Sequence, residues 1–443
     1  MELSLRRSLQ FTPTAELPSL QSVARVNGQI HAIVIIGAAL VALFLKLSIA
    51  YYTFGTNDVA AFYMFARSLN EHGLEWTYRN GVPWLSNSPV FNHPPLPAYY
   101  LQLIDVLSRQ EFCRAHGLTF PFLLRLPGIV ADFIAALILF RTIGTSQIRI
   151  PLWALVLFAL SPVSIMVAGF HGNTDPVMVM FLLVASYMCL RGRPILCGIF
   201  FALSCQIKVI PLLVLPVFCF FWLRRGTALR FTVAFVLLTA TMWSYALVSF
   251  PLLFVRNVIA YGSYWGHWGI TYWLQLTGSP QLNATRFAMP AAATVIAVLL
   301  KAAIILAAVV IAWRRRCLSA EAAISSIAYA WIVFFVFTPG FCAYYLAWLA
   351  PFVLILSPVF YAWLTAMSAL FLFFFYNGLT GGLPWFIGVS KYTDPDRLSL
   401  LTPWSLWPWV TVICGMILLW KKAVNAAPSL RLFSLEPLPL DGA

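Results

Sequence analysis

A succession of apolar runs, separated by short polar turns, constrains this chain more than any other feature. About twelve of these runs approach the ~20 residues that an α-helix needs to cross a bilayer. Charged residues make up only 9% of the chain, whereas a soluble domain carries about a quarter. We therefore expect an all-α integral membrane protein with about 12 transmembrane helices, within a range of about 10–13. The expected spans are residues 30–51, 121–140, 150–169, 177–190, 194–209, 211–223, 231–250, 289–313, 321–338, 343–356, 359–376 and 403–420.

The basic residues predict the orientation of these helices. Arg6, Arg7 and Arg25 precede the first span, and further arginines recur at alternate turns, as is typical of cytoplasmic loops. The net charge of +14 is then a membrane-anchoring charge and does not indicate a nucleic-acid partner. Most acidic residues fall on the opposite, outer side, where we expect the chemistry. The expected divisions are a cytoplasmic tail at 1–29, one polytopic membrane domain at 30–420 with outer loops at 52–120, 251–288 and 377–402, and a cytoplasmic tail at 421–443.

The segment 194–223 has two alternative interpretations. It is either one long helix kinked at Pro211 and Pro216 or two short helices in a hairpin. We favour the hairpin, because a single crossing would place the Arg224–Arg225 pair on the outer side. Lys208 then lies near the outer turn of the hairpin.

Asp58, early in the first outer loop, is the leading candidate for chemistry. Apolar side chains follow it at helical spacing, which predicts a helix on the outer membrane surface. Thr56, Asn57 or Asp58 would then cap this helix, a role worth about 1 kcal/mol. The alternative is a general base held at the membrane surface. Further along, the Pro94–Pro95 pair fixes an extended segment, so His93 is either presented to a ligand or part of a structural corner.

Two later outer turns carry further candidates. Asp175 precedes Pro176, a pair typical of a helix start, but Asp175 and His171 could equally bind sugar hydroxyls together. Tyr344 and Tyr345 stand at the start of a predicted helix, on the outer side. They belong either to the interfacial aromatic belt or to a site for a lipid-linked ligand.

Cations form a last group on the outer side. Arg125, Lys208 and Arg256 are expected there, and most such side chains extend to lipid head groups. The alternative is a phosphate site, because charged groups at membrane depth commonly face a cavity and arginine suits phosphate. The aromatic segment 261–268 is an interfacial belt or a sugar-stacking wall, and residues 283–285 match an N-glycosylation acceptor.

Taken in order, these motifs resemble the GT-C superfamily of membrane glycosyltransferases. The stretch from Gly172 to Pro211 is similar to bacterial polyprenol-phosphate-mannose-dependent mannosyltransferases. Asn57 stands where many relatives have a second acid, which argues against a metal-binding acidic pair. The resemblance rests on Asp58 after the first span, Asn92–Leu96, Leu124–Pro127 running into Ala131–Asp132, Gly172–Asp175, Leu190–Pro194 leading to Lys208 and Pro211, and Tyr344–Trp348.

The resemblance implies an inverting glycosyltransferase on the outer side of a bacterial plasma membrane or in the lumen of the endoplasmic reticulum. It would move a hexose, with mannose the closest match, from a polyprenyl or dolichyl phosphate to a lipid, glycan or protein hydroxyl. No cofactor and no metal are expected. The alternatives are a secondary transporter and a lipid-glycan ligase or polymerase. The implied general base is Asp58, and the implied donor-binding residues are His93, Arg125, His171, Asp175, Lys208, Arg256, Tyr344 and Tyr345.

Overall fold

The computed structural model describes residues 20–82, 91–143, 145, 148–260, 268–269, 291–316, 319–380 and 402–425. All regular elements in these ranges are helices. This follows from the apolar sequence, because a helix satisfies its backbone hydrogen bonds within itself. The elements are α1 (Leu20–Tyr52), α2 (Asn57–Asn80), α3 (Pro95–Ser108), α4 (Glu111–Ala115), α5 (Phe120–Ile143), α6 (Leu152–Ala159), α7 (Pro162–Ser164), η1 (Ile165–His171), α8 (Asp175–Leu190), α9 (Pro194–Ile207), η2 (Ile210–Val214), α10 (Leu215–Arg224), α11 (Ala228–Ser249), α12 (Pro251–Phe254), η3 (Val255–Ile259), α14 (Ala291–Arg314), α15 (Ala320–Phe337), η4 (Ala343–Tyr345), α16 (Leu346–Leu356), α17 (Pro358–Thr380), η5 (Thr402–Ser405) and α19 (Leu406–Asn425).

These helices coincide with the predicted spans. Among the described residues, seven helices are long and apolar enough to cross a membrane, and five shorter apolar helices accompany them. The predicted fold class, an all-α multi-pass membrane protein, is therefore confirmed. The first helix is longer than expected, because α1 begins at Leu20 rather than at Ile30.

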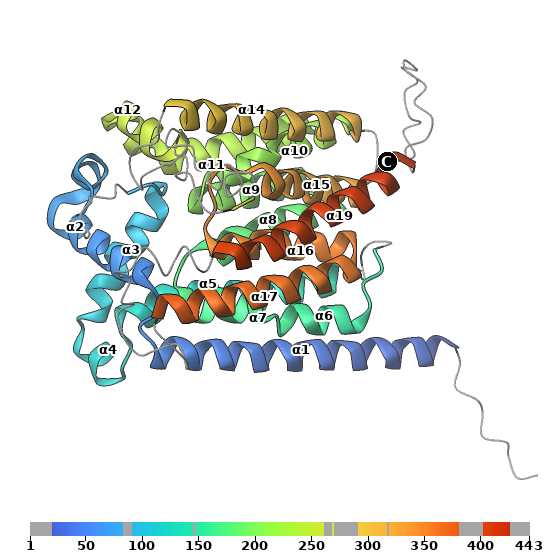
Figure 1. Cartoon of the computed structure of the whole chain (residues 1–443), viewed down its shortest axis with the longest axis horizontal. Coiled ribbons are helices and arrows are strands. Elements are labelled where there is room, and N and C mark those ends of the chain that lie inside the picture. The colour runs from blue at the N-terminus through green and yellow to red at the C-terminus, as the bar shows by residue number, and fades with distance from the viewer. Residues whose placement is uncertain are drawn as a thin grey trace, which may run out of the picture.

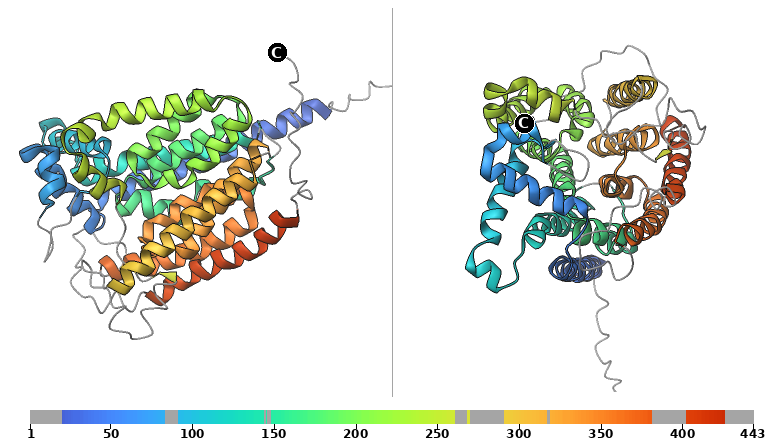
Figure 2. Two further views of the ribbon diagram at one scale, coloured as in Figure 1. Left: turned by 90° about the horizontal axis from the view of Figure 1, so that it is seen from above. Right: turned by 60° about the vertical axis from the view of Figure 1, so that its left-hand side comes forward.

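The helices lie side by side in a bundle, and the first outer loop folds over one end of it (Figure 1). Helices α2, α3 and α4 gather at this end, whereas α1 extends along one edge and packs on α5. Figure 2 shows the C-terminal helices α14 to α19 grouped on one side of the bundle and α8 to α11 on the other. We call the end that carries α2 to α4 the outer end, following the predicted orientation.

Helices α9 and α10 form the predicted hairpin. The indole Nε1 of Trp222 donates to Sγ of Cys197 at 3.4 Å, and the rings of Phe201 and Phe218 lie 4.9 Å apart. Cys197 lies near the start of α9 and Trp222 near the end of α10, while Phe201 and Phe218 both lie closer to the turn between them, so the two helices are antiparallel. Lys208 follows α9 in extended backbone (φ −148°, ψ 149°), where the chain turns. The preference for a hairpin over one kinked helix is confirmed.

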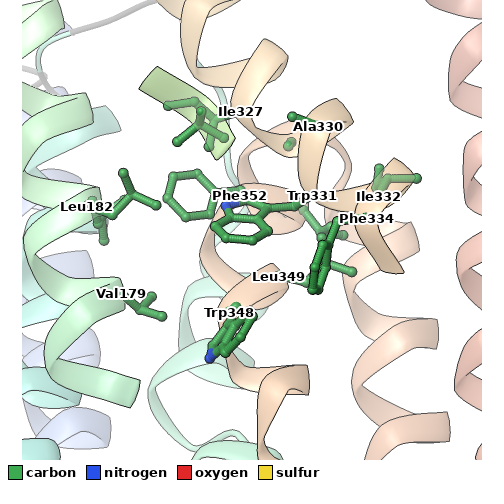
Figure 3. Packing of buried hydrophobic residues seen from close by; sticks show 14 of the residues in the cluster. Val179, Leu182, Ile327, Ala330, Trp331, Ile332, Phe334, Trp348, Leu349 and Phe352 are labelled. Carbon is green, nitrogen blue, oxygen red and sulfur yellow. The ribbon is translucent and has the colours of Figure 1, made fainter. Parts of the chain in front are cut away.

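Aromatic side chains fill the core between α8, α15 and α16. Trp331 is completely buried, and its ring lies 5.7 Å from the ring of Trp348 (Figure 3). Val179 and Leu182 of α8 approach these rings from the facing helix (Figure 3). Because Trp348 is part of this core, its indole is held rigidly near the start of α16.

An ion pair inside the bundle ties α1 to α5. Lys46 Nζ lies 2.9 Å from Asp132 Oδ2, and the Ser164 hydroxyl is hydrogen-bonded to both groups. Gly169 permits this packing, since a Cβ there would lie 3.2 Å from the Cα of Lys46. Charges at this depth pair because an isolated charge in an apolar medium is costly.

Candidate functional site

Asp58 lies in the first turn of α2 and binds a distant part of the chain. Its Oδ2 lies 2.9 Å from Nε2 of His171. Thr56 occupies the N-cap position of α2, but its side chain makes no capping bond and donates instead to the carbonyl oxygen of His171 at 2.8 Å. Neither side chain therefore caps α2, which corrects the capping interpretation. Both fasten the start of α2 to the turn that carries His171.

The turn that presents His171 has an unusual backbone. The π-helical segment η1 ends at His171, and Gly172 follows in the left-handed region with φ 85°. A Cβ at Gly172 would overlap Cγ2 of Val59, so the position requires glycine for space as well as for conformation. His171 is 4% exposed, and its Nδ1 has no hydrogen-bond partner among the described residues. π segments often occur at functional sites, where they redirect a side chain.

Asp175 and Lys208 form the second ion pair of the site. Lys208 Nζ lies 2.5 Å from Asp175 Oδ1, and Trp348 Nε1 donates to Asp175 Oδ2 at 2.8 Å. Asp175 is fully buried in the first turn of α8. Pro176 follows it in that turn, as the sequence predicts, but the carboxylate binds Lys208 and Trp348 rather than capping the helix. The charge of Asp175 is thus neutralised within the protein.

Tyr344 and Tyr345 complete the site beside α16. The Tyr344 ring lies 4.6 Å from the ring of His171 and 4.8 Å from Nζ of Lys208. Lys208 Nζ is also 5.3 Å from the Tyr345 ring and 5.5 Å from the Trp348 ring, distances at which a cation is attracted to an aromatic face. The cluster joins residues from α2, η1, α8, η4 and α16 with Lys208, which follows α9. We call it the outer polar cluster, and its members are Asp58, His171, Asp175, Lys208, Tyr344, Tyr345 and Trp348.

His93 borders this cluster from the loop before α3. It is buried, and its Nδ1 lies 3.3 Å from the carbonyl oxygen of Ile207. The Tyr78 hydroxyl donates to the backbone carbonyl oxygen of His93 at 2.5 Å. Burial, together with the charge of Lys208, lowers the pKa of His93 to about 3. The imidazole is therefore neutral at physiological pH and adds no charge to the cluster.

Asp58 is the most exposed of the four ion-pairing side chains of the cluster. Its side chain is 34% exposed, compared with 16% for Lys208 and 5% for His171. Desolvation raises the pKa of the Asp58 carboxyl, but the hydrogen bond from His171 and the charges of His171 and Lys208 outweigh it, so the pKa is lowered overall. Asp58 is therefore an accessible anion at neutral pH, and a lowered pKa makes it a weaker general base.

Arg125 has a different role from the one expected. Its guanidinium is completely buried and donates to carbonyl oxygens at the C-terminal ends of α1 and η1. The bonds include Nη2 to Ala50 O at 3.0 Å and Nη1 to Gly169 O at 3.1 Å. A cation at a helix C-terminus satisfies carbonyl groups that have no partner in the helix. Every guanidinium nitrogen already binds the protein, which corrects the expectation that Arg125 binds a phosphate.

Arg256 does not join the cluster either. It is exposed in η3, while its neighbour Asn257 is buried and donates to the carbonyl oxygen of Tyr78 at 2.6 Å. Of the aromatic segment 261–268, only Trp268 is described. It is buried and stacks on Phe341, with ring centroids 3.8 Å apart. Residues 261–267 and the acceptor pattern at 283–285 lie outside the described residues.

Trp348 is the one member of the cluster for which no binding role was predicted from the sequence. It follows Tyr344 by four residues and Tyr345 by three, so helical spacing places all three rings on one face. This spacing was the available signal, since an indole N–H on that face needs an acceptor when it is buried. In the part of the chain that the structure describes, no group of three or more histidine, cysteine or carboxylate side chains could hold a metal ion.

A comparison with family models gives a match over the central part of the chain. Residues 59–285 match the family described as GPI transamidase subunit PIG-U, which is just over half of the chain. The matched range contains His93, His171, Asp175 and Lys208, and Asp58 immediately precedes it. A search of curated proteins finds no match.

This match corrects the expected activity. The resemblance to glycosyltransferases implied hexose transfer from a polyprenyl phosphate, with Asp58 as the base. The matched family is instead described as a subunit of a transamidase. A transamidase exchanges amide bonds and not glycosidic bonds. The prediction of a glycosyltransferase is therefore wrong, and the lipid-glycan ligase alternative agrees better with the match.

Proposed function

This chain belongs to the GPI transamidase subunit PIG-U family, and we propose that it is a membrane subunit of such a transamidase. In this role it works together with other subunits in the membrane of the endoplasmic reticulum. The complex attaches a glycolipid to a protein, so its substrates are one lipid and one polypeptide. The outer end of the helix bundle then faces the lumen.

We assign to the outer polar cluster the binding of the glycolipid head group. The observation that carries this assignment is the Asp58–His171 contact beside the Lys208–Asp175 ion pair, at the outer end of a largely apolar bundle. A lipid in the bilayer presents its head group at this level. Ionisable side chains at membrane depth commonly mark a substrate site, because burying them is costly without a use.

The chemistry of the cluster supports binding rather than nucleophilic catalysis. Cys342 is a thiol beside Tyr344 and Tyr345, and it is influenced by the charges of Asp58 and Lys208. Desolvation raises the pKa of the Cys342 thiol. A reactive cysteine needs a lowered pKa, because the thiolate is the nucleophile. We therefore expect the acyl transfer to take place on another subunit.

A replacement experiment in the source cells tests this function. Cells without the chain should lose GPI-anchored proteins from their surface, as measured by flow cytometry, and should accumulate free glycolipid. Wild-type chain should restore both. Asp58→Ala should restore them poorly, whereas Glu75→Ala, which removes an exposed carboxylate of the same helix α2, should restore them fully. Normal surface levels of anchored proteins in cells without the chain would refute the proposed function.

Isolation of the complex provides a second, biochemical test. A tagged chain solubilised in mild detergent should co-purify with other transamidase subunits, identified by mass spectrometry. Asp58→Ala should co-purify equally well, because the Asp58 side chain contacts His171 within the chain and is part of a ligand site in this proposal.

A further inference from the structure

The charges of the outer polar cluster do not favour an anion. Two carboxylates, Asp58 and Asp175, stand against the single ammonium of Lys208, and that ammonium is already paired with Asp175 at 2.5 Å. His93 is buried and neutral, and His171 either is neutral or carries one positive charge. The cluster is thus at most neutral, and negative whenever His171 is neutral. A phosphate entering this site would meet no unpaired cation.

Arg125 does not add a positive charge to the part of the cluster that a ligand reaches. Its guanidinium is completely buried, and backbone carbonyl oxygens surround it. Of the charged side chains of the cluster, the most exposed is instead the Asp58 carboxylate, at 34%. Its Oδ2 binds His171, and among the described contacts no group of the protein donates to Oδ1.

A second observation also indicates a missing ligand. His171 is 4% exposed, and its Nδ1 has no hydrogen-bond partner among the described residues. Buried polar atoms in native proteins nearly always have a partner, so an orphan atom calls for an explanation. Nε2 of the same ring binds Asp58, so a ligand on Asp58 would lie at the Nε2 edge of the imidazole, while the orphan Nδ1 shows that the hydrogen bonding of this cluster is incomplete within the described residues.

We infer that Asp58 binds the ammonium group of an amine-bearing ligand, with the second carboxylate oxygen as the acceptor. This deepens the proposed function by naming the chemical group that the cluster takes from a head group. A carboxylate and an ammonium form a charge-assisted hydrogen bond, which is stronger than a neutral one. The Tyr344 ring packs against His171, the hydrogen-bond partner of Asp58, with ring centroids 4.6 Å apart. An aromatic ring beside the pair lowers the local dielectric, which strengthens a charge-assisted hydrogen bond there.

Lipid binding to the full-length protein in nanodiscs tests this inference. The probes are photoactivatable lysophosphatidylethanolamine and the matched lysophosphatidylglycerol, which share the phosphate and the acyl chain and differ in the ammonium group. We expect preference for the ethanolamine probe by about tenfold. Cross-links should map to the start of α2 and to residues 342–348. Competition by soluble ethylamine distinguishes recognition of the amine alone from recognition of a lipid head group.

Variants make the result decisive. Asp58→Asn should abolish the preference, Asp58→Glu should keep part of it, and Glu75→Gln should leave it unchanged. Preference for the glycerol probe, an unchanged preference in Asp58→Asn, or wild-type cross-links confined to other elements would overturn the inference. This readout does not depend on partner subunits, so the amine site and the proposed function can fail separately.

Discussion

Lys208, which follows α9, and Asp175, which begins α8, form an ion pair with Nζ 2.5 Å from Oδ1. The pair lies beside three aromatic rings and receives a further hydrogen bond from Trp348. Asp175 is completely buried, and the Lys208 side chain is 16% exposed. Lys208, proposed from the sequence as a cation for a ligand, therefore neutralises the Asp175 carboxylate of the protein instead.

Removing one partner of this pair should destabilise the protein more than removing both. Asp175→Asn leaves an ammonium without a counter-charge and Lys208→Met leaves a buried carboxylate, so each should cost about 3–5 kcal/mol. The double variant should cost clearly less than the sum of the two, because neither charge remains. Thermal unfolding of the four proteins in one detergent measures this coupling. Additive losses would show that the two side chains act independently.

Arg125 should prove essential for stability and Arg256 dispensable. Arg125→Lys keeps the charge but loses the planar fork that reaches several carbonyl oxygens at once, and we expect a loss of about 2–4 kcal/mol. Arg256→Lys changes an exposed side chain and should remain within about 0.5 kcal/mol of wild type. Unfolding midpoints of the two variants, compared with wild type, test this. Similar midpoints for both variants would contradict the role assigned to Arg125.

His93 should make the fold sensitive to acid. Burial lowers its pKa from 6.5 to about 3, so between these values the unfolded chain binds a proton that the folded protein does not. The free energy of unfolding should therefore be unaffected by this group above pH 6.5 and fall by roughly 1.4 kcal/mol per unit as the pH drops toward 3.

The variant His93→Gln should remove this slope, whereas His116→Gln, which changes an exposed histidine, should retain it. Chemical denaturation at a series of pH values from about 7.5 to 4.5 gives the slopes. Identical slopes for His93→Gln and wild type would show that the histidine is not held neutral in the folded state.

Gly172 should tolerate alanine less well than Gly226. Both residues have positive φ, 85° and 68°, so alanine incurs a conformational penalty of about 1–2 kcal/mol at either position. A Cβ at Gly172 would also overlap Val59, whereas a Cβ at Gly226 meets nothing within 4 Å. We expect about 1–3 kcal/mol of additional destabilisation for Gly172→Ala, with displacement of His171. Equal losses for the two variants would exclude a steric role for Gly172.

The resemblance between motifs misled the prediction of activity for a physical reason. The resemblance made Asp58 the catalytic base and His171, Asp175 and Lys208 donor-binding residues. In the folded protein Asp58 binds His171 and Asp175 binds Lys208, so these residues also hold the outer end of the bundle together. Short motifs specify where polar residues stand along the chain, but they do not specify which contacts these residues make.

The sequence by itself determined the helices of this protein and their hairpin at Lys208. A long apolar run in a bilayer has few alternatives to a helix, because every backbone group must find its hydrogen bond within the same segment. Only the tertiary structure decided which charges meet. Asp58 lies far along the chain from His171, as Arg125 does from Ala50, and contacts at such separations depend on how helices pack, which local pattern does not encode. The cluster therefore became visible only when α2, η1, α8, η4, α16 and the turn after α9 were brought together at the outer end.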